Sequence, residues 1–162
     1  MLYLDVFREL EKKSVRYLVV GGIAVNLYGY VRLTVDLDLM LDLCEENLER
    51  FVKVMEKLGY KPMQPVDARE IILKEKRDEW KKEKGALVLT FFNPEKPYKQ
   101  VDFFLENIVD FDTAFGRKNV LNVGGVNIYL ASIDDLINIK ARTGRPRDIE
   151  DIIHLERIKK LK

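Results

Sequence analysis

Two apolar segments near the start of the chain restrict its fold more than any other feature. Residues 19–26 read VVGGIAVN, and residues 33–41 read LTVDLDLML. The first contains a pair of glycines, and the second contains Asp36 and Asp38 within an otherwise apolar run. A carboxylate without a partner is costly to bury in apolar surroundings. A fold for this chain must therefore give these two aspartates either solvent or a binding partner.

The glycine pair, Gly21-Gly22, lies between a predicted strand and a predicted helix. Residues 17–20 favour a buried strand, and residues 23–28 favour a short helix. Glycines at such a junction let a ligand approach the backbone closely, and the helix N-terminus offers free N–H groups to phosphate. An ordinary tight turn is the alternative. The segment matches neither the GxGxxG nor the GxxxxGK(S/T) pattern.

The two aspartates indicate a metal site. In a strand over residues 35–41 side chains alternate, so Asp36 and Asp38 share a face, roughly 7 Å apart at Cα. Like charges at this distance repel, and a divalent cation such as Mg²⁺ removes the repulsion. The alternative is that this face is exposed to solvent on an edge strand. Asp102 is a third acid in an apolar strand, and it would join the others if the two strands were neighbours, which the sequence leaves open.

The remaining pattern predicts an α+β fold, with a mixed sheet flanked by helices. Further strands are expected over residues 86–92, 100–105, 121–123 and 126–129, and helices over 3–13, 46–58, 66–84, 132–142 and 146–160. Gly124-Gly125 fits a hairpin turn between the last two strands. The length fits one domain, residues 1–162, with the catalytic sheet and its helices in 1–130 and a C-terminal helical pair in 131–162.

Composition argues against several classes of protein. Lys and Arg number 28 against 27 Asp and Glu, and the net charge of +1 gives no global basic field for nucleic acid. The single cysteine, Cys44, cannot form a disulfide within the chain, and with only one histidine, His154, a Cys/His zinc site is not expected. The first residues lack the pattern of a signal peptide, and the longest uncharged run is too short to span a bilayer. We therefore expect a cytoplasmic protein with no membrane partner.

Four motifs, in order along the chain, resemble the nucleotidyltransferase superfamily, which has the polymerase-β-like fold. They are Gly21-Gly22 between strand and helix, RLTVDLD at residues 32–38, Asp102 in a later strand, and a tail with ASIDDLINIK at 131–140 and GRPRDIED at 144–151. Within the superfamily the sequence is most similar to the small bacterial and archaeal proteins related to AbiEii toxin nucleotidyltransferases. The resemblance covers nearly the whole chain, and it is more specific for the fold than for the substrate.

The resemblance implies a role for each motif. Asp36, Asp38 and Asp102 would bind metal, and Asp102 could instead be the base for the attacking hydroxyl. Lys140 would contact the phosphates and complete the catalytic set with these three aspartates. The nucleotide site would be formed by Gly21, Gly22, Arg32, Thr34, Lys140 and Asp148.

The implied activity is metal-dependent transfer of NMP from an NTP to a hydroxyl acceptor. The cofactor would be Mg²⁺ or Mn²⁺, and the acceptor an RNA such as tRNA, a protein hydroxyl or a small molecule. The alternative is a toxin–antitoxin component with a partner protein, or a nucleotide-binding regulatory module with little or no catalysis.

The C-terminal region supplies further candidates. Lys140 stands where an aliphatic residue would continue the apolar stripe of its helix, so it either has a function or extends to solvent. Asp148 and Asp151 share a helix face and could simply favour the helix N-terminus. Residues 140–162 hold eight basic and four acidic residues, a charge of +4 that could meet RNA or be solvated. Trp80, in a charge-dense helix, is the candidate anchor for a protein acceptor.

Overall fold

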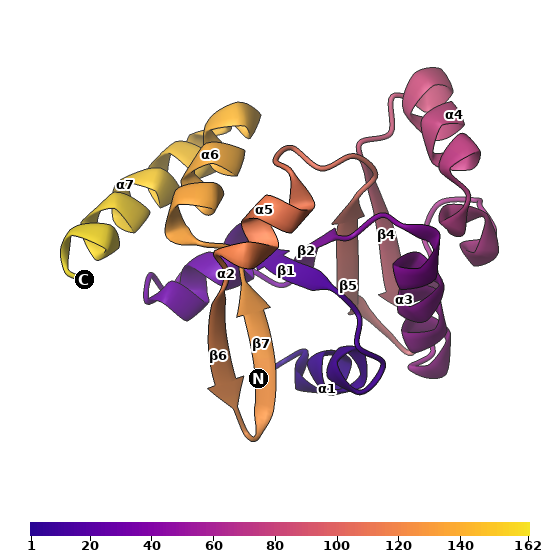
Figure 1. The fold of residues 1–162 in the computed structure, drawn as a ribbon, viewed down its shortest axis with the longest axis horizontal. Coiled ribbons are helices and arrows are strands. Elements are labelled where there is room, and N and C mark those ends of the chain that lie inside the picture. The colour runs from indigo at the N-terminus through magenta and orange to yellow at the C-terminus, as the bar shows by residue number, and fades with distance from the viewer.

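The computed structural model describes all 162 residues as a seven-stranded mixed sheet with helices packed around it (Figure 1). The strands are β1 (Tyr17–Val20), β2 (Leu37–Leu41), β3 (Lys61–Pro62), β4 (Val88–Asn93), β5 (Lys96–Phe104), β6 (Asn119–Val123) and β7 (Val126–Leu130). The helices are α1 (Leu4–Lys12), α2 (Gly21–Tyr28), α3 (Glu45–Lys57), α4 (Lys74–Lys84), α5 (Phe111–Gly116), α6 (Ile133–Thr143) and α7 (Pro146–Lys160), with a 3₁₀ helix η1 at Ala68–Ile72.

The strand order explains how distant segments meet. The order is β3-β4-β5-β2-β1-β7-β6, so β2 lies between β1 and β5. It runs antiparallel to β1 and parallel to β5. The strand that carries Asp38 is therefore next to the strand that carries Asp102, and also next to β1, which ends just before Gly21. The mixed sheet expected from the sequence is confirmed.

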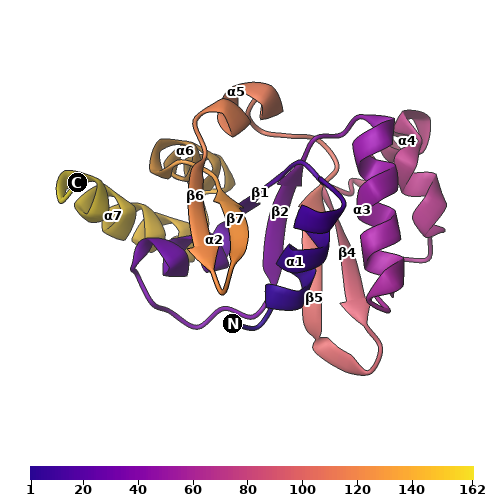
Figure 2. The same ribbon diagram turned by 60° about the horizontal axis from the view of Figure 1, so that its bottom comes forward.

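One face of the sheet is covered by α1 and α3, which lie in front of it in Figure 2. Phe7 of α1 stacks on Tyr17 with ring centroids 6.0 Å apart, and Phe51 of α3 makes edge-on contacts with Phe91 and Phe103. These side chains belong to one continuous buried core. Because side chains alternate along a strand, the neighbours of Phe103 and of the buried Leu39 point to the opposite face. Asp102 and Asp38 are two of those neighbours.

The C-terminal helices begin and end where the sequence signals lie. The Ser132 hydroxyl accepts a hydrogen bond from the Asp135 amide at 3.1 Å and so caps α6. Gly144 follows α6 in the left-handed conformation, and Pro146 is the first residue of α7. The two helices pack against each other beside the β6–β7 end of the sheet (Figure 1). No helix in the chain is both long and apolar enough to cross a bilayer.

Strand β2 starts two residues later than predicted. The Tyr3 hydroxyl donates a hydrogen bond to the Val35 carbonyl at 2.7 Å and accepts one from the Gln100 amide at 3.0 Å. These bonds take up backbone groups that a longer β2 would pair with its neighbour. Regular pairing with β5 therefore begins at Leu37, and Asp36 lies just outside the strand.

Other parts of the structure also differ from the expectations. Helix α2 begins at Gly21, so the glycine pair forms its first turn and not a separate loop. The single helix expected over residues 66–84 is broken at Leu73 into η1 and α4. Trp80 is only 6% exposed and packs in the core, so the expectation of an exposed anchor for a protein acceptor was wrong. Helix α5 was not predicted at all.

Candidate active site

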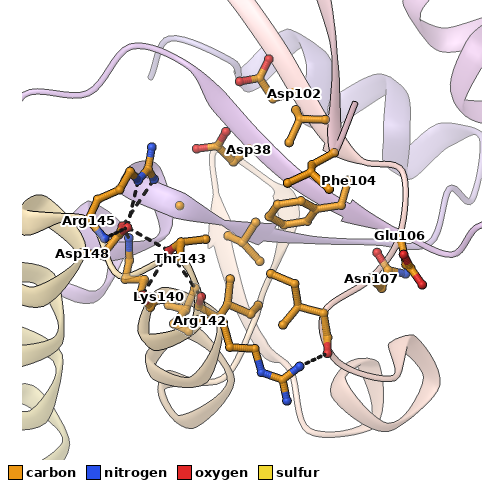
Figure 3. Close-up of a pocket in the computed structure, with 17 residues that line it drawn as sticks. Asp38, Asp102, Phe104, Glu106, Asn107, Lys140, Arg142, Thr143, Arg145 and Asp148 are labelled. Atoms are coloured by element: carbon orange, nitrogen blue, oxygen red, sulfur yellow. Dashed lines mark hydrogen bonds and ion pairs between the residues drawn. The ribbon is translucent and has the colours of Figure 1, made fainter. Parts of the chain in front are cut away.

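A cavity of about 1020 Å³ opens on the sheet face that α1 and α3 leave uncovered, and α6 and the start of α7 form its far wall (Figure 3). Besides Gly21, its lining includes the polar residues Asp38, Asp102, Glu106, Asn107, Lys140, Arg142, Thr143, Arg145 and Asp148. Its apolar lining residues are Val20, Leu87, Val88, Phe104, Ile108, Leu136 and Ile139. Five of the residues predicted to be functional therefore meet in one place: Gly21, Asp38, Asp102, Lys140 and Asp148.

Asp38 and Asp102 lie directly opposite each other on the parallel strands β2 and β5. Burial raises the pKa of Asp38 to about 7, and the neighbouring carboxylates of Asp102 and Asp36 add to the increase. Burial also raises the pKa of Asp102. One oxygen of Asp102, Oδ1, is buried and accepts no hydrogen bond. The charge of Lys140 lowers the pKa of Asp38 only partly, so these two adjacent carboxylates still repel each other when both are ionised.

Gly21 stands against this carboxylate pair. It has a φ of +70°, and a Cβ atom built there would overlap the carboxylate and the Cβ of Asp38. The absence of a side chain at Gly21 therefore makes room for the carboxylate of Asp38, a group of the protein itself, and not for a ligand. Gly22 makes a second close approach, because a Cβ there would lie 2.6 Å from Thr34 Oγ1 and 2.9 Å from Arg32 Nη2. Both glycines are required by packing at the start of α2.

Four of the predicted site residues do not line the cavity: Asp36, Gly22, Arg32 and Thr34. Asp36 is half-buried, and no three acidic, histidine or cysteine side chains in the chain are close enough to hold a metal ion together. The remaining carboxylates, Asp38 and Asp102, still fit a divalent cation, because their pKa values are raised and Asp102 Oδ1 has no partner. Mg²⁺ is commonly held by one or two carboxylates together with substrate phosphates.

Lys140 does not extend to solvent. Its side chain is 5% exposed, and its ammonium lies 2.8 Å from Asp151 Oδ2 and 3.6 Å from Asp148 Oδ1. Burial alone would raise the pKa of Asp148, but hydrogen bonds from Arg145 and Thr143 lower it to about 2. Burial opposes ionisation of Asp151 as well, and its hydrogen bonds with Arg32 and Lys140 outweigh that effect and lower its pKa. Both aspartates are therefore buried partners of cations, and not merely charges that favour a helix N-terminus.

Arg32 attaches the segment before β2 to the α6–α7 wall of the cavity. Its Nε and Nη2 each donate to a different oxygen of Asp151, both at 2.8 Å. Asn26 also fixes the backbone of Arg32, since its side chain accepts from the Arg32 amide and donates to the Arg32 carbonyl, both at 3.0 Å. The guanidinium of Arg32 thus connects α2 and β2 to α7, and its role in this structure is to hold Asp151.

Several cavity residues were not singled out as site residues from the sequence. Glu106 and Asn107 directly follow the strand that carries Asp102, and this position was the only available signal. Arg142 donates from Nη1 to the Ile108 carbonyl at 3.0 Å and so joins α6 to the segment after β5. Arg145 extends from the start of α7 toward the side of the cavity where Asp38 lies (Figure 3). Its neighbours Lys140 and Asp148 were the signal that could have drawn attention to it.

Comparisons with known proteins address the family and the fold of the chain. Residues 3–162 match the model of a family described as nucleotidyltransferase of unknown function (DUF6036). A search of curated protein sequences found no match.

Three solved structures share the fold at low sequence identity. A lincosamide antibiotic adenylyltransferase with lincomycin bound is 17% identical, with a TM-score of 0.60 over 94% of this chain and 93% of that one. The antibiotic-resistance factor ANT(2'')-Ia is 14% identical, with a TM-score of 0.61 over 99% and 86%. An antigenic nucleotidyltransferase-like protein from Paracoccidioides brasiliensis is 17% identical, with a TM-score of 0.53 over 93% and 71%. The predicted nucleotidyltransferase fold is thereby confirmed.

Proposed function

Because the chain belongs to this family of nucleotidyltransferases, we propose that it transfers NMP from an NTP to a hydroxyl group of an acceptor. The observation that carries the proposal is the position of Asp38 and Asp102. Their two carboxyl groups lie side by side on the sheet face of the cavity, opposite a wall that contains Lys140 and Arg145. A site with carboxylates on one side and cations on the other suits a metal-bound triphosphate.

Asp38 and Asp102 are the residues that would hold Mg²⁺ or Mn²⁺. A bound divalent cation of this kind supplies stabilisation of the charge on the attacking and leaving oxygens. Asp102 Oδ1, which is buried and has no partner, would complete the cation site or accept the proton of the attacking hydroxyl. Asp36 as a third ligand stays a prediction.

The other residues of the chain bind and orient the triphosphate. Helix α2 begins at the cavity, so its first N–H groups lie beside the carboxylate pair. Lys140 and Arg145 contribute the positive charge of the opposite wall. The N–H groups of α2 and the exposed cation of that wall would hold the triphosphate in line with the acceptor hydroxyl, which is the main contribution of protein in such transfers.

A small organic molecule is the acceptor that the cavity favours. Leu87, Phe104 and Ile108 give the cavity an apolar side, on the segments around β4 and β5. Two of the structures with the same fold are named for action on, or resistance to, antibiotics, which supports an acceptor of this size. Trp80 is buried and is not available to bind a protein acceptor.

RNA is the second candidate acceptor, and α7 provides the observation for it. The first turn of the helix reaches the cavity with Asp148, and its last turns carry Arg157, Lys159 and Lys160. At 1.5 Å per residue these cations lie roughly 14–18 Å along the helix from Asp148, within reach of an RNA whose end enters the cavity. The AbiEii-like subfamily and a toxin–antitoxin role remain predictions from resemblance.

The test is transfer of label from each α-labelled NTP, with Mg²⁺ or Mn²⁺, to total RNA, to lysate protein and to a panel of small hydroxyl compounds. Loss of all transfer in Asp38→Asn and Asp102→Asn is the expected result. An RNA acceptor would also require transfer that falls steeply with salt and with the triple change of Arg157, Lys159 and Lys160 to Glu. If calorimetry detects no binding of any NTP in the presence of metal, the proposal is wrong.

A further inference from the structure

Five charged side chains form one cluster at the α6–α7 wall of the cavity, and their charges do not sum to zero. The cations are Arg32, Lys140 and Arg145, and the carboxylates are Asp148 and Asp151, which leaves 3 − 2 = +1. Four of the five side chains are at most 14% exposed, whereas that of Arg145 is 73% exposed. The unbalanced positive charge of the cluster therefore reaches the cavity at Arg145.

Lys140 is poorly placed to bind a ligand directly. Its ammonium is 2.8 Å from Asp151 and 3.6 Å from Asp148, and its side chain is 5% exposed. Turning the ammonium toward a phosphate would leave buried carboxylates with fewer partners. Removing one partner from a buried ion pair is strongly unfavourable, because it leaves a buried charge uncompensated.

Arg145 has the opposite properties. Its Nε donates to Asp148 Oδ2 at 2.9 Å, and Nη2 lies 3.4 Å from Asp148 Oδ1. Its backbone amide donates to the same carboxylate at 3.1 Å, so both ends of the residue are fixed by Asp148. Nη1 has no protein partner, and the guanidinium faces the cavity that Asp38 also lines. A guanidinium held along one edge with its other edge free is suited to two-point binding of phosphate.

Asp148 is in turn held by residues on α6. The Thr143 hydroxyl donates to Asp148 Oδ2 at 2.8 Å, and Lys140 lies beside the other oxygen. These contacts keep the carboxylate charged and aimed at Arg145. The series Lys140, Asp148, Arg145 thus runs from the interior of the protein to the cavity.

We propose that Arg145 is the residue that binds the triphosphate of the NTP, and that Lys140 is a buried partner of Asp148 and Asp151 that does not bind it. This inference rests on the proposed function, and it moves to Arg145 a task that the sequence assigns to Lys140. The ligand class is a polyphosphate, and the nucleoside is bound by other parts of the cavity.

The experiment compares Arg145→Ala and Arg145→Lys with Arg147→Ala as the matched control. Arg147 is two residues away on the same helix, is exposed, and does not line the cavity. Calorimetry with metal present would measure the affinity for NTP, for the matching nucleoside and for inorganic tripolyphosphate. We expect Arg145→Ala to weaken binding of NTP and tripolyphosphate at least tenfold, with nucleoside binding little changed. Its melting temperature should fall, because the buried Asp148 loses a partner, so binding is measured well below that temperature. Arg145→Lys should recover part of the loss, and Arg147→Ala should bind like the wild type.

Lys140→Met gives the second measurement. We expect its melting temperature to fall, and its tripolyphosphate affinity to stay within about threefold of wild type when measured well below that temperature. Wild-type affinity in Arg145→Ala, together with a tenfold loss in folded Lys140→Met, would overturn the inference and make Lys140 the phosphate ligand. In that case the proposed function would still stand if the wild type binds NTP and Asp38→Asn abolishes transfer.

Discussion

The carboxylate of Asp38 occupies the space that a side chain at position 21 would need. A Cβ built on Gly21 would overlap the carboxylate and Cβ of Asp38, and Gly21 also has a positive φ of +70°. The first residue of α2 and the second residue of β2 are thus fitted to each other. Any side chain at position 21 must displace one of the two carboxylates that the proposed activity uses.

Gly21→Ala is therefore expected to impair both folding and transfer. The left-handed backbone alone costs an alanine about 1–2 kcal/mol. Gly125→Ala is the matched control, because Gly125 has a φ of +82° but no atom within 4 Å of a built Cβ. Urea unfolding should show a larger loss of stability in Gly21→Ala, and only this variant should lose transfer, by tenfold or more. Equal stability and equal activity in the two variants would show that the overlap with Asp38 is relieved without consequence.

Asp38→Asn should abolish transfer without weakening the metal-free protein. Asparagine keeps the shape of the side chain and removes a charge that faces Asp102 without a positive partner. We expect activity to fall at least a hundredfold and the metal-free melting temperature to stay the same or rise. A fall of many degrees would assign Asp38 a structural role. Asp36→Asn is the comparison, and a loss as large as that of Asp38→Asn would support the three-carboxylate metal site predicted from the sequence.

Lys140→Met should destabilise the protein, although the sequence alone predicts a harmless change that extends an apolar stripe. The structure differs because Lys140 is a buried partner of Asp151 and Asp148. Arg32 still pairs with Asp151 in the variant, so we expect a loss of about 2–3 kcal/mol in the free energy of unfolding. Lys159→Met removes only a surface ion pair with Asp134 and should have little effect. Matching denaturation curves for the two variants would contradict this prediction.

Asp148 should make stability depend on pH in the acidic range. Its pKa in the folded protein is about 2, against 3.8 for the free side chain. Since the folded state favours the ionised form, this contribution is present above about pH 4 and is lost as the pH falls toward 2. The difference corresponds to roughly 2 kcal/mol. The gap in unfolding free energy between wild type and Asp148→Asn should therefore narrow from pH 5 to pH 2.5, and a constant gap would show that the charge of Asp148 is not what stabilises the fold.

Local signals in the sequence predicted the elements that they directly encode. Ser132 begins α6 and Pro146 begins α7, because capping and the fixed φ of proline act within a few residues. Helix α5 was missed, since six residues are too few to show a helical period. The start of β2 was misplaced because the hydroxyl of Tyr3, far away in sequence, takes up the Val35 carbonyl.

The site was predictable in its residue types but not in its contacts. Asp38 and Asp102 were candidates from their apolar surroundings, yet their pairing depends on β5 lying beside β2, which is a property of the whole sheet. The partner of Lys140 is Asp151, eleven residues further on in the next helix, and no periodicity within one helix reveals it. For the same reason the sequence could not show whether the cation that reaches the cavity is Lys140 or Arg145.

The hydrogen bonds of Tyr3 connect the amino-terminal segment to the two strands that carry Asp38 and Asp102, although Tyr3 does not line the cavity. Its hydroxyl joins Val35, just before β2 begins, to Gln100, just upstream of Asp102 in β5. If β5 slid by one residue, Asp102 would turn to the face under α1 and α3, and an apolar side chain would stand opposite Asp38. The hydroxyl of Tyr3, the residue just before the first helix, therefore reinforces the alignment of the two acids that the pairing of β2 with β5 gives. We therefore expect changes at that end of the chain to alter the proposed transfer activity even when every residue of the cavity stays the same.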